Sequence, residues 1–316
     1  MKRKKPASQA TDDTVLSAGD LTRRAFCAGA GAALTLPALS VHADATSSAV
    51  PPEDFRIRGG RIRHSVMAWC FSAVPPETLI KACARMGLAA MEGIGREHYP
   101  AIRAAGMNIS LVSSHGFGKG PVSRANHESC IRLLREAIDV AVQFGTDKVI
   151  TFTGMREPGM TDEVAAQNCV DCWKQVIRYA EEKKVTLCLE HLNTRDDTHP
   201  MKGHPGYFGD DVERCVDLIR RVDSPRMKLL FDIYHVQIMN GDVIRRIQRH
   251  KDVVAHIHTA GVPGRGELDL DQEVNYPAVM RALAGIGYTG YVAHEFIPTW
   301  PDKLAALRHG VRVCDV

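Results

Sequence analysis

The 316-residue sequence lacks a strong excess of either charge. Its 40 Lys and Arg residues nearly balance its 37 Asp and Glu residues, which leaves a formal net charge of +3. Apart from a basic run at residues 2–5, the two signs are mixed along the chain. Proteins that bind nucleic acid usually concentrate basic residues on one face. The balance therefore argues against a nucleic-acid partner.

The N-terminal region lacks an apolar segment long enough to cross a membrane. Residues 25–39 are apolar, but a spanning helix needs roughly 20 residues. The pair Arg23-Arg24 precedes this stretch, and small residues around Ala43 follow it. This order is typical of a twin-arginine export signal. We expect residues 1–43 to be a cleaved signal that directs the protein to the periplasm, with no stable membrane association afterwards; a disordered tail is the alternative.

The nine cysteines lack the spacing of a structural zinc site. Cys169 and Cys172 form a CxxC pair, but no second Cys pair or Cys/His pair follows at a suitable distance. Cys70, Cys188 and Cys215 lie in apolar segments, where a thiol packs as a small hydrophobic group. These positions weaken the case for a disulfide framework, although an exported protein with many cysteines would ordinarily suggest one.

From residue 61 onward, short β-rich segments alternate with amphipathic helical segments. Helical spacing of apolar residues marks 76–86, 127–144, 161–183, 210–222 and 276–285. The expected strands are 63–71, 89–94, 107–114, 148–153, 186–192, 227–234, 253–259 and 290–297. Eight such units predict an α/β fold, a single-domain (β/α)8 TIM barrel over residues 61–316, preceded by a linker at 44–60. A doubly wound sheet is the alternative, but no Gly-rich turn follows the first strand.

Charged residues occur near the ends of the last four expected strands, where a buried strand should be apolar. They are Glu190, Asp232, His258 and Glu295. In a TIM barrel these ends converge on the catalytic face. Carboxylate and imidazole ligands without thiolate favour Mn²⁺, Mg²⁺ or Co²⁺. The pattern predicts one divalent metal ion; for any single strand, a satisfied buried pair is the alternative.

Further polar residues surround this expected centre. His256 faces the same side of its strand as His258 but lies one layer deeper, where a supporting hydrogen bond is the usual role. His235 follows Asp232 closely enough to lean over the pocket from the loop. Arg265, in the loop after the seventh strand, suits a carboxylate or a polarised carbonyl, with a solvent-facing side chain as the alternative.

Several segments together resemble a known family. FDIYHVQ, HIHTAGVPGRGELD, NYPAVMRALAGIGYTGYVAHEFIP and the early RIRHSVMAWC look like the hydroxypyruvate isomerase group of the xylose-isomerase-like TIM barrels. The resemblance implies the same four metal ligands, with Glu190 and Glu295 as the acid/base pair. It also implies substrate contacts at His235 and Arg265. Hydroxypyruvate isomerases have Gln at position 258, whereas the ketose epimerases have His as here.

The resemblance implies proton transfer next to a carbonyl, through an enediolate that a metal ion stabilises. We expect a sugar or hydroxy-keto-acid isomerase acting on a small molecule, with Lys202, His204 and His256 as further pocket residues. A ketose 3-epimerase, a metal-dependent lyase acting on a keto-sugar and a non-catalytic periplasmic sugar-binding protein are the alternatives. A homo-oligomer is compatible with the sequence.

Overall fold

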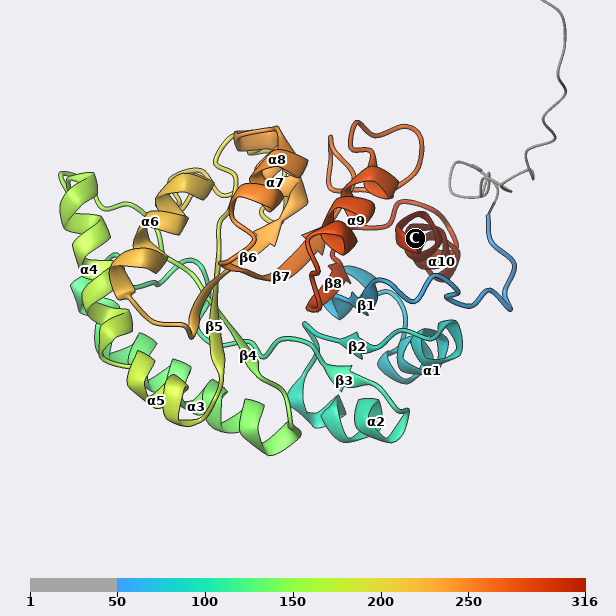
Figure 1. Ribbon diagram of the computed structural model, residues 1–316, viewed down its shortest axis with the longest axis horizontal. Helices are drawn as coiled ribbons and strands as arrows, with labels where there is room; N and C mark the ends of the chain where they lie inside the picture. Colours follow the sequence, from blue (N-terminus) through green and yellow to red (C-terminus); the bar gives the residue numbers. More distant parts are fainter. Residues whose placement is uncertain (1–49) are drawn as a thin grey trace, which may run out of the picture. The chain divides into compact units, whose positions relative to one another are not determined.

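The computed structural model describes residues 50–316, in which eight strands alternate with helices (Figure 1). The predicted export signal and residues 44–49 of the predicted linker lie outside the described residues. The strands are β1 Arg63–Val66, β2 Ala90–Met91, β3 Asn108–Ile109, β4 Lys148–Thr151, β5 Thr186–Glu190, β6 Met227–Asp232, β7 Val254–Thr259 and β8 Tyr291–His294. Each predicted strand region contains one of these strands, which is shorter than the prediction.

All strand pairs are parallel. Six strands form one sheet in the order β1-β8-β7-β6-β5-β4, and β2 pairs with β3. Single bridges at Met67/Glu92 and Val112/Val149 join this pair to the two edges of the larger sheet. Backbone hydrogen bonds therefore run around all eight strands, as in a TIM barrel, and the carboxyl ends of the strands share one face.

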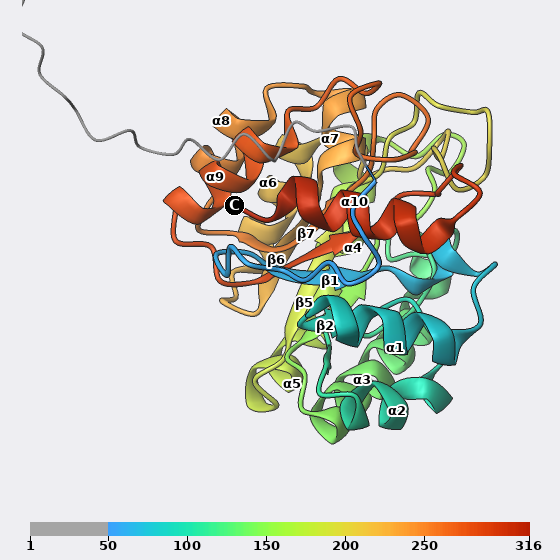
Figure 2. The same ribbon diagram turned by 90° about the vertical axis from the view of Figure 1, so that its right-hand side faces the viewer.

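The helices lie outside the strands in both views (Figures 1 and 2). Each covers the sheet with an apolar face; in α3, for example, Leu134, Ile138 and Ala141 are buried at helical spacing. The helices are α1 Pro76–Met86, α2 Tyr99–Ala104, α3 His127–Phe144, α4 Asp162–Lys174, α5 Ile177–Glu182, α6 Val212–Val222, α7 Ile233–Met239, α8 Val243–Arg249, α9 Tyr276–Gly285 and α10 Lys303–Cys314. Three 3₁₀ turns complete the set: η1 Ala68–Phe71, η2 Arg96–His98 and η3 Arg124–Asn126.

Two of the differences from the predicted boundaries have local reasons. The helix expected over 161–183 divides into α4 and α5, because Gln175 and Val176 donate to carbonyls three residues back and tighten the chain there. The strand expected over 227–234 ends at Asp232, whose side chain accepts a hydrogen bond from Tyr234 N and starts α7. Asp232, a candidate metal ligand, therefore lies at the junction between β6 and α7.

The start of the described chain is bound to the barrel. Ile57 N donates to Met86 O at the end of α1, and the backbone amides of Arg58 and Gly59 donate to the Asp315 carboxylate. The eight cysteines between residues 50 and 316 are free thiols with buried side chains. Within the same residues, no helix is both long and apolar enough to span a bilayer.

Candidate metal centre

Four acidic and imidazole side chains converge at the carboxyl end of the barrel. Glu190 ends β5, Asp232 ends β6, His258 lies in β7, and Glu295 directly follows β8. One possible ligand atom from each lies within 4.8 Å of the others, and all four residues are buried. Glu295 was expected inside the last strand; it lies one residue beyond, with its backbone N still bonded to Thr259 O. The predicted four ligands therefore share one site.

His258 lies between two carboxylates on one side of its ring and a third on the other. Its Nδ1 lies 2.5 Å from Glu295 Oε2 and 3.3 Å from Glu190 Oε1. On the other side of the ring, Nε2 is hydrogen-bonded to Glu92 Oε1 at 2.8 Å. Burial would lower the pKa of His258, but the surrounding carboxylates outweigh it and raise that pKa well above its usual value, so that without a cation both ring nitrogens carry protons. A bound cation would take the place of the proton on Nδ1 and leave the proton on Nε2.

The convergent atoms fit a bound cation. Among the described residues, His258 Nδ1, Glu190 Oε1 and Glu295 Oε2 are buried without a well-directed hydrogen-bond partner. An imidazole lone pair this close to carboxylate oxygens is repelled unless a proton or a cation lies between them. Oxygen and imidazole donors suit Mn²⁺, Mg²⁺ or Co²⁺. These four residues would hold such an ion.

The carboxyl groups interact strongly with one another. Burial, reinforced by the charge of Glu295, raises the pKa of Glu190 to about 7. Burial likewise raises the pKa of Asp232 to about 6, against the opposing charge of Arg265. Burial would also raise the pKa of Glu295, but the charges of Arg265 and His258 outweigh it and hold that pKa at about 2. The site thus concentrates negative charge that a divalent cation would stabilise.

The two oxygens of Asp232 have separate partners. Oδ1 accepts from Tyr234 N at 2.8 Å and caps α7. Oδ2 faces the site, 3.4 Å from Arg265 Nη2 and 3.6 Å from His235 Nε2. The helix start therefore fixes the direction in which Asp232 presents its second oxygen.

His235 lies in the first turn of α7 rather than in a loop. Its Nδ1 accepts from Asn193 N at 3.1 Å and lies 2.7 Å from Asn193 Nδ2. Burial and the charge of Arg265 lower the pKa of His235 well below its usual value. The neutral ring then carries its proton on Nε2, which faces Asp232, so His235 can donate a hydrogen bond into the site.

Arg265 is buried inside the site, which excludes the solvent-facing alternative. Its Nη2 lies 2.8 Å from Glu295 Oε2, and Nη1 donates to Met201 O. Within residues 50–316, its buried Nε has no hydrogen-bond acceptor. The side chain thus orients Glu295 and keeps one donor free.

The remaining predicted pocket residues occupy different positions. His204 is buried, with its ring 4.2 Å from the ring of Phe117 and 6.1 Å from that of His235. The ammonium of Lys202 lies beside Gly264, in the loop that carries Arg265. His256 lies one layer deeper, 2.9 Å from Glu92, a position that fits support rather than substrate contact.

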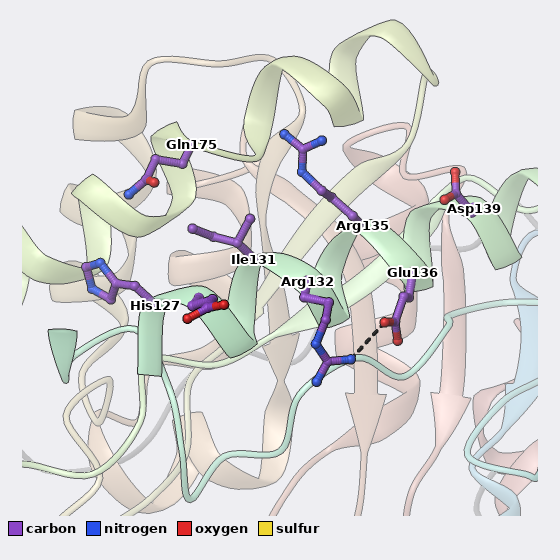
Figure 3. Close-up of a pocket in the computed structure, with 8 residues that line it drawn as sticks. His127, Ile131, Arg132, Arg135, Glu136, Asp139 and Gln175 are labelled. Atoms are coloured by element: carbon purple, nitrogen blue, oxygen red, sulfur yellow. Dashed lines mark hydrogen bonds and ion pairs between the residues drawn. The ribbon is translucent and has the colours of Figure 1, made fainter. Parts of the chain in front are cut away.

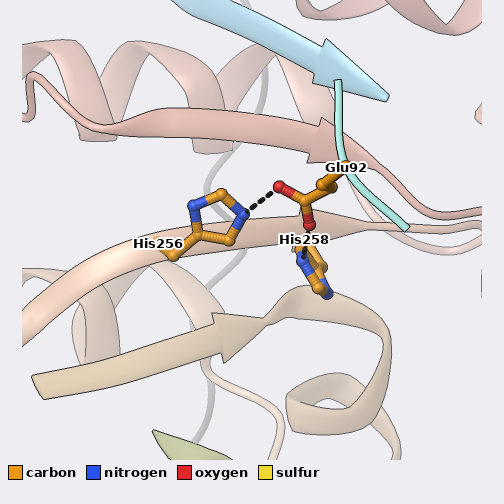
Figure 4. A group of neighbouring side chains, drawn as sticks. All are labelled: Glu92, His256 and His258. Carbon is orange, nitrogen blue, oxygen red and sulfur yellow. Dashed lines mark hydrogen bonds and ion pairs between the residues drawn. The ribbon is translucent and has the colours of Figure 1, made fainter. Parts of the chain in front are cut away.

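Glu92 was not predicted as part of the site. It follows β2 and contacts both histidines of β7, as Figure 4 shows. The signal that could have found it is the one used for the later strands, a carboxylate inside the apolar segment AAMEGI.

A surface depression of about 560 Å³ lies elsewhere, on the outer side of α3 (Figure 3). An ion pair between Arg132 and Glu136, at the (i, i+4) spacing, crosses part of it. Such pairs are usual on solvated helix faces. The depression contains none of the four converging residues, so it is no candidate for the chemistry.

Comparison with known proteins agrees with this geometry. The model of the family described as Xylose isomerase-like TIM barrel matches residues 80–315, and the chain belongs to this family. A Drosophila melanogaster protein named "Putative hydroxypyruvate isomerase" is 32% identical over 66% of this chain and 78% of its own. A 2-oxo-tetronate isomerase of Pectobacterium atrosepticum is 25% identical over 73% and 90%. The crystal structure of a 3-keto-D-glucoside 4-epimerase from E. coli has a TM-score of 0.65 at 16% identity, covering 80% of this chain and 99% of that one, which shows the shared fold.

Proposed function

We propose that this protein is a divalent-metal-dependent isomerase that transfers a proton next to the carbonyl of a small hydroxy-keto acid or sugar. The observation that carries the proposal is the buried convergence of Glu190, Asp232, His258 and Glu295. The names of the two relatives from Drosophila melanogaster and Pectobacterium atrosepticum support an isomerase, since they refer to hydroxypyruvate and a 2-oxo-tetronate.

The residues of the site would have separate roles in the reaction. When bound, the divalent ion would supply Lewis-acid stabilisation of the negative charge that develops on the substrate oxygens. Glu190 and Glu295 come from different strand ends and supply two carboxylates for taking and returning the proton. Arg265 Nε and His235 Nε2 offer hydrogen bonds to substrate oxygens, and burial of the site strengthens these contacts.

A ketose 3-epimerase is the second candidate. The residue that favours this candidate is His258, because the epimerases that the sequence resembles have His at this position, whereas hydroxypyruvate isomerases have Gln. The two glutamates suit either reaction: one carboxylate can return the proton to the neighbouring carbon, or the second can return it to the other face of the same carbon. We place the reaction in the periplasm, on the strength of the twin-arginine pattern at residues 23–24.

The test is a panel of hydroxy-keto acids and ketoses incubated in D₂O with the Mn²⁺-loaded protein. Mass spectrometry detects deuterium at carbon even where the product equilibrium is unfavourable, and NMR of the separated product distinguishes isomer from epimer. We expect exchange with at least one three- to six-carbon substrate and none after chelation. Cleavage products without isomerisation would replace the proposal with the lyase, and binding without exchange would replace it with a sugar-binding protein.

A further inference from the structure

We infer that Glu92 is a positioning residue that selects the tautomer of His258, so that Nδ1 rather than Nε2 is offered to the metal ion. This inference rests on the proposed metal centre. It assigns a role to the buried pair Glu92–His256, whose Glu92 contacts His258 (Figure 4).

The carboxylate of Glu92 contacts three polar side chains. Oε1 is 2.8 Å from His258 Nε2; Oε2 is 2.9 Å from His256 Nε2 and accepts from Ser110 Oγ at 2.5 Å. The Ser110 hydroxyl in turn contacts Ser65 Oγ at 2.6 Å. Both carboxylate oxygens therefore have partners, and Glu92 faces His258 as an acceptor.

Two backbone hydrogen bonds also fix the position of Glu92. Glu92 N donates to Val66 O and Glu92 O accepts from Ala68 N, so the residue is tied to both sides of Met67 after β1. Glu92 and both histidines have almost no exposed surface. Because the side chains of Glu92 and His258 are both buried, neither can form a hydrogen bond with bulk water instead. The fold therefore fixes the hydrogen bond between them.

That bond excludes one arrangement of His258. In the metal-bound protein, a neutral ring with its proton on Nδ1 would turn the Nε2 lone pair toward Glu92 Oε1, which would place two acceptors 2.8 Å apart in a buried site. The same ring would turn an N–H group toward the position where the ion is expected. With the proton on Nε2, both contacts are favourable. Outer-shell carboxylates of this kind orient metal-binding histidines and strengthen their donation.

His256 and Ser110 act on Glu92 rather than on the ion. The His256 ring packs edge-on against that of His258, with centroids 5.1 Å apart at 84°. Glu92, His256, Ser110 and Ser65 thus form a connected layer beneath the four ligands. The prediction from this arrangement is that replacing Glu92 weakens metal binding although Glu92 itself is no ligand.

The first measurement is the Mn²⁺ dissociation constant, from the electron paramagnetic resonance signal of the free ion. Glu92→Gln keeps the volume but removes the charge, and we expect it to weaken binding by about tenfold to a hundredfold. Glu97→Gln removes an exposed carboxylate five residues away and should leave the constant unchanged. Ser110→Ala takes one donor from Glu92 and should have a clearly smaller effect than Glu92→Gln.

The second measurement reads the tautomer directly and needs no Glu92 variant. In protein labelled with ¹⁵N-histidine and saturated with Mg²⁺, two-bond couplings show which ring nitrogen carries hydrogen; a His258→Gln spectrum assigns the signal. We expect the proton on Nε2. A proton on Nδ1, or unchanged Mn²⁺ affinity in a folded Glu92→Gln variant, would overturn the inference. Failure of the wild-type protein to bind Mn²⁺ would instead contradict the proposed metal centre.

Discussion

Nδ1 of His258 lies 2.5 Å from Oε2 of Glu295. A lone pair and a carboxylate oxygen approach this closely only when a positive charge is shared between them. Glu190 and Asp232 complete the group from the two preceding strand ends. The predictions below follow from treating this group as a metal centre that also carries the proton-transfer carboxylates.

Asp232 has two roles that two substitutions separate. Asp232→Ala should lose bound metal in elemental analysis and also lose the cap of α7, a cost of about 0.5–2 kcal/mol. Asp232→Asn should bind metal weakly but keep the cap through its amide oxygen. Denaturant unfolding of both metal-free variants should therefore show Asp232→Asn to be the more stable. Equal stability of the two would show that the cap is unimportant, and full metal occupancy in Asp232→Ala would show that Asp232 is no ligand.

His258→Gln should retain part of the metal, whereas His258→Ala should lose it. A glutamine amide has an acceptor and a donor at its end, so its oxygen can face the ion while its NH₂ group faces Glu92. Because glutamine is the residue of the hydroxypyruvate isomerases, the variant should also shift relative kcat/KM toward keto acids. Full occupancy in His258→Ala would point to His256 as the histidine ligand.

Removing the ion should destabilise the fold. A ligand that binds only the folded state contributes about 2.7 kcal/mol when present at 100 times its Kd. Chelation should lower Tm in a thermal scan, and added Mn²⁺ should restore it. Asp232→Ala provides the control, since its Tm should not respond to Mn²⁺. An equal response in that variant would place the ion elsewhere.

The export signal gives a prediction that is independent of the site. Arg23→Lys combined with Arg24→Lys should block translocation and leave precursor in the cytoplasm, because the twin-arginine route depends on the arginine pair. Fractionation followed by immunoblotting measures the distribution. Normal delivery of the double variant to the periplasm would exclude this route.

Eight β-rich segments alternating with amphipathic helical segments predicted the barrel, and charges in its buried strands predicted the convergence of the four ligands. A charge in a strand buried on both faces is costly, so Glu190, Asp232, His258 and Glu295 marked the same depth in successive strands. Glu92 was missed, although it lies inside the expected strand 89–94, because the expected strands on either side of it carry no carboxylate that would mark a shared site. The start of α7 was missed because Asp232 caps the helix without an intervening turn. The burial of Arg265 depends on contacts with Met201, Asp232 and Glu295, which lie far away in sequence.

The central claim is that Glu190 and Glu295 transfer the proton, and deuterium exchange by two variants tests it most directly. Glu190→Gln and Glu295→Gln each keep an oxygen that can coordinate but remove a base, which typically costs about 10² to 10⁴ in rate. On a confirmed substrate in D₂O, with metal content checked, we expect exchange to fall by such factors. Loss of exchange in only one variant favours a single-base isomerase. If each variant instead loses exchange from one substrate epimer but not from the other, a two-base epimerase is favoured. Near-normal exchange in both metal-loaded variants would contradict the account.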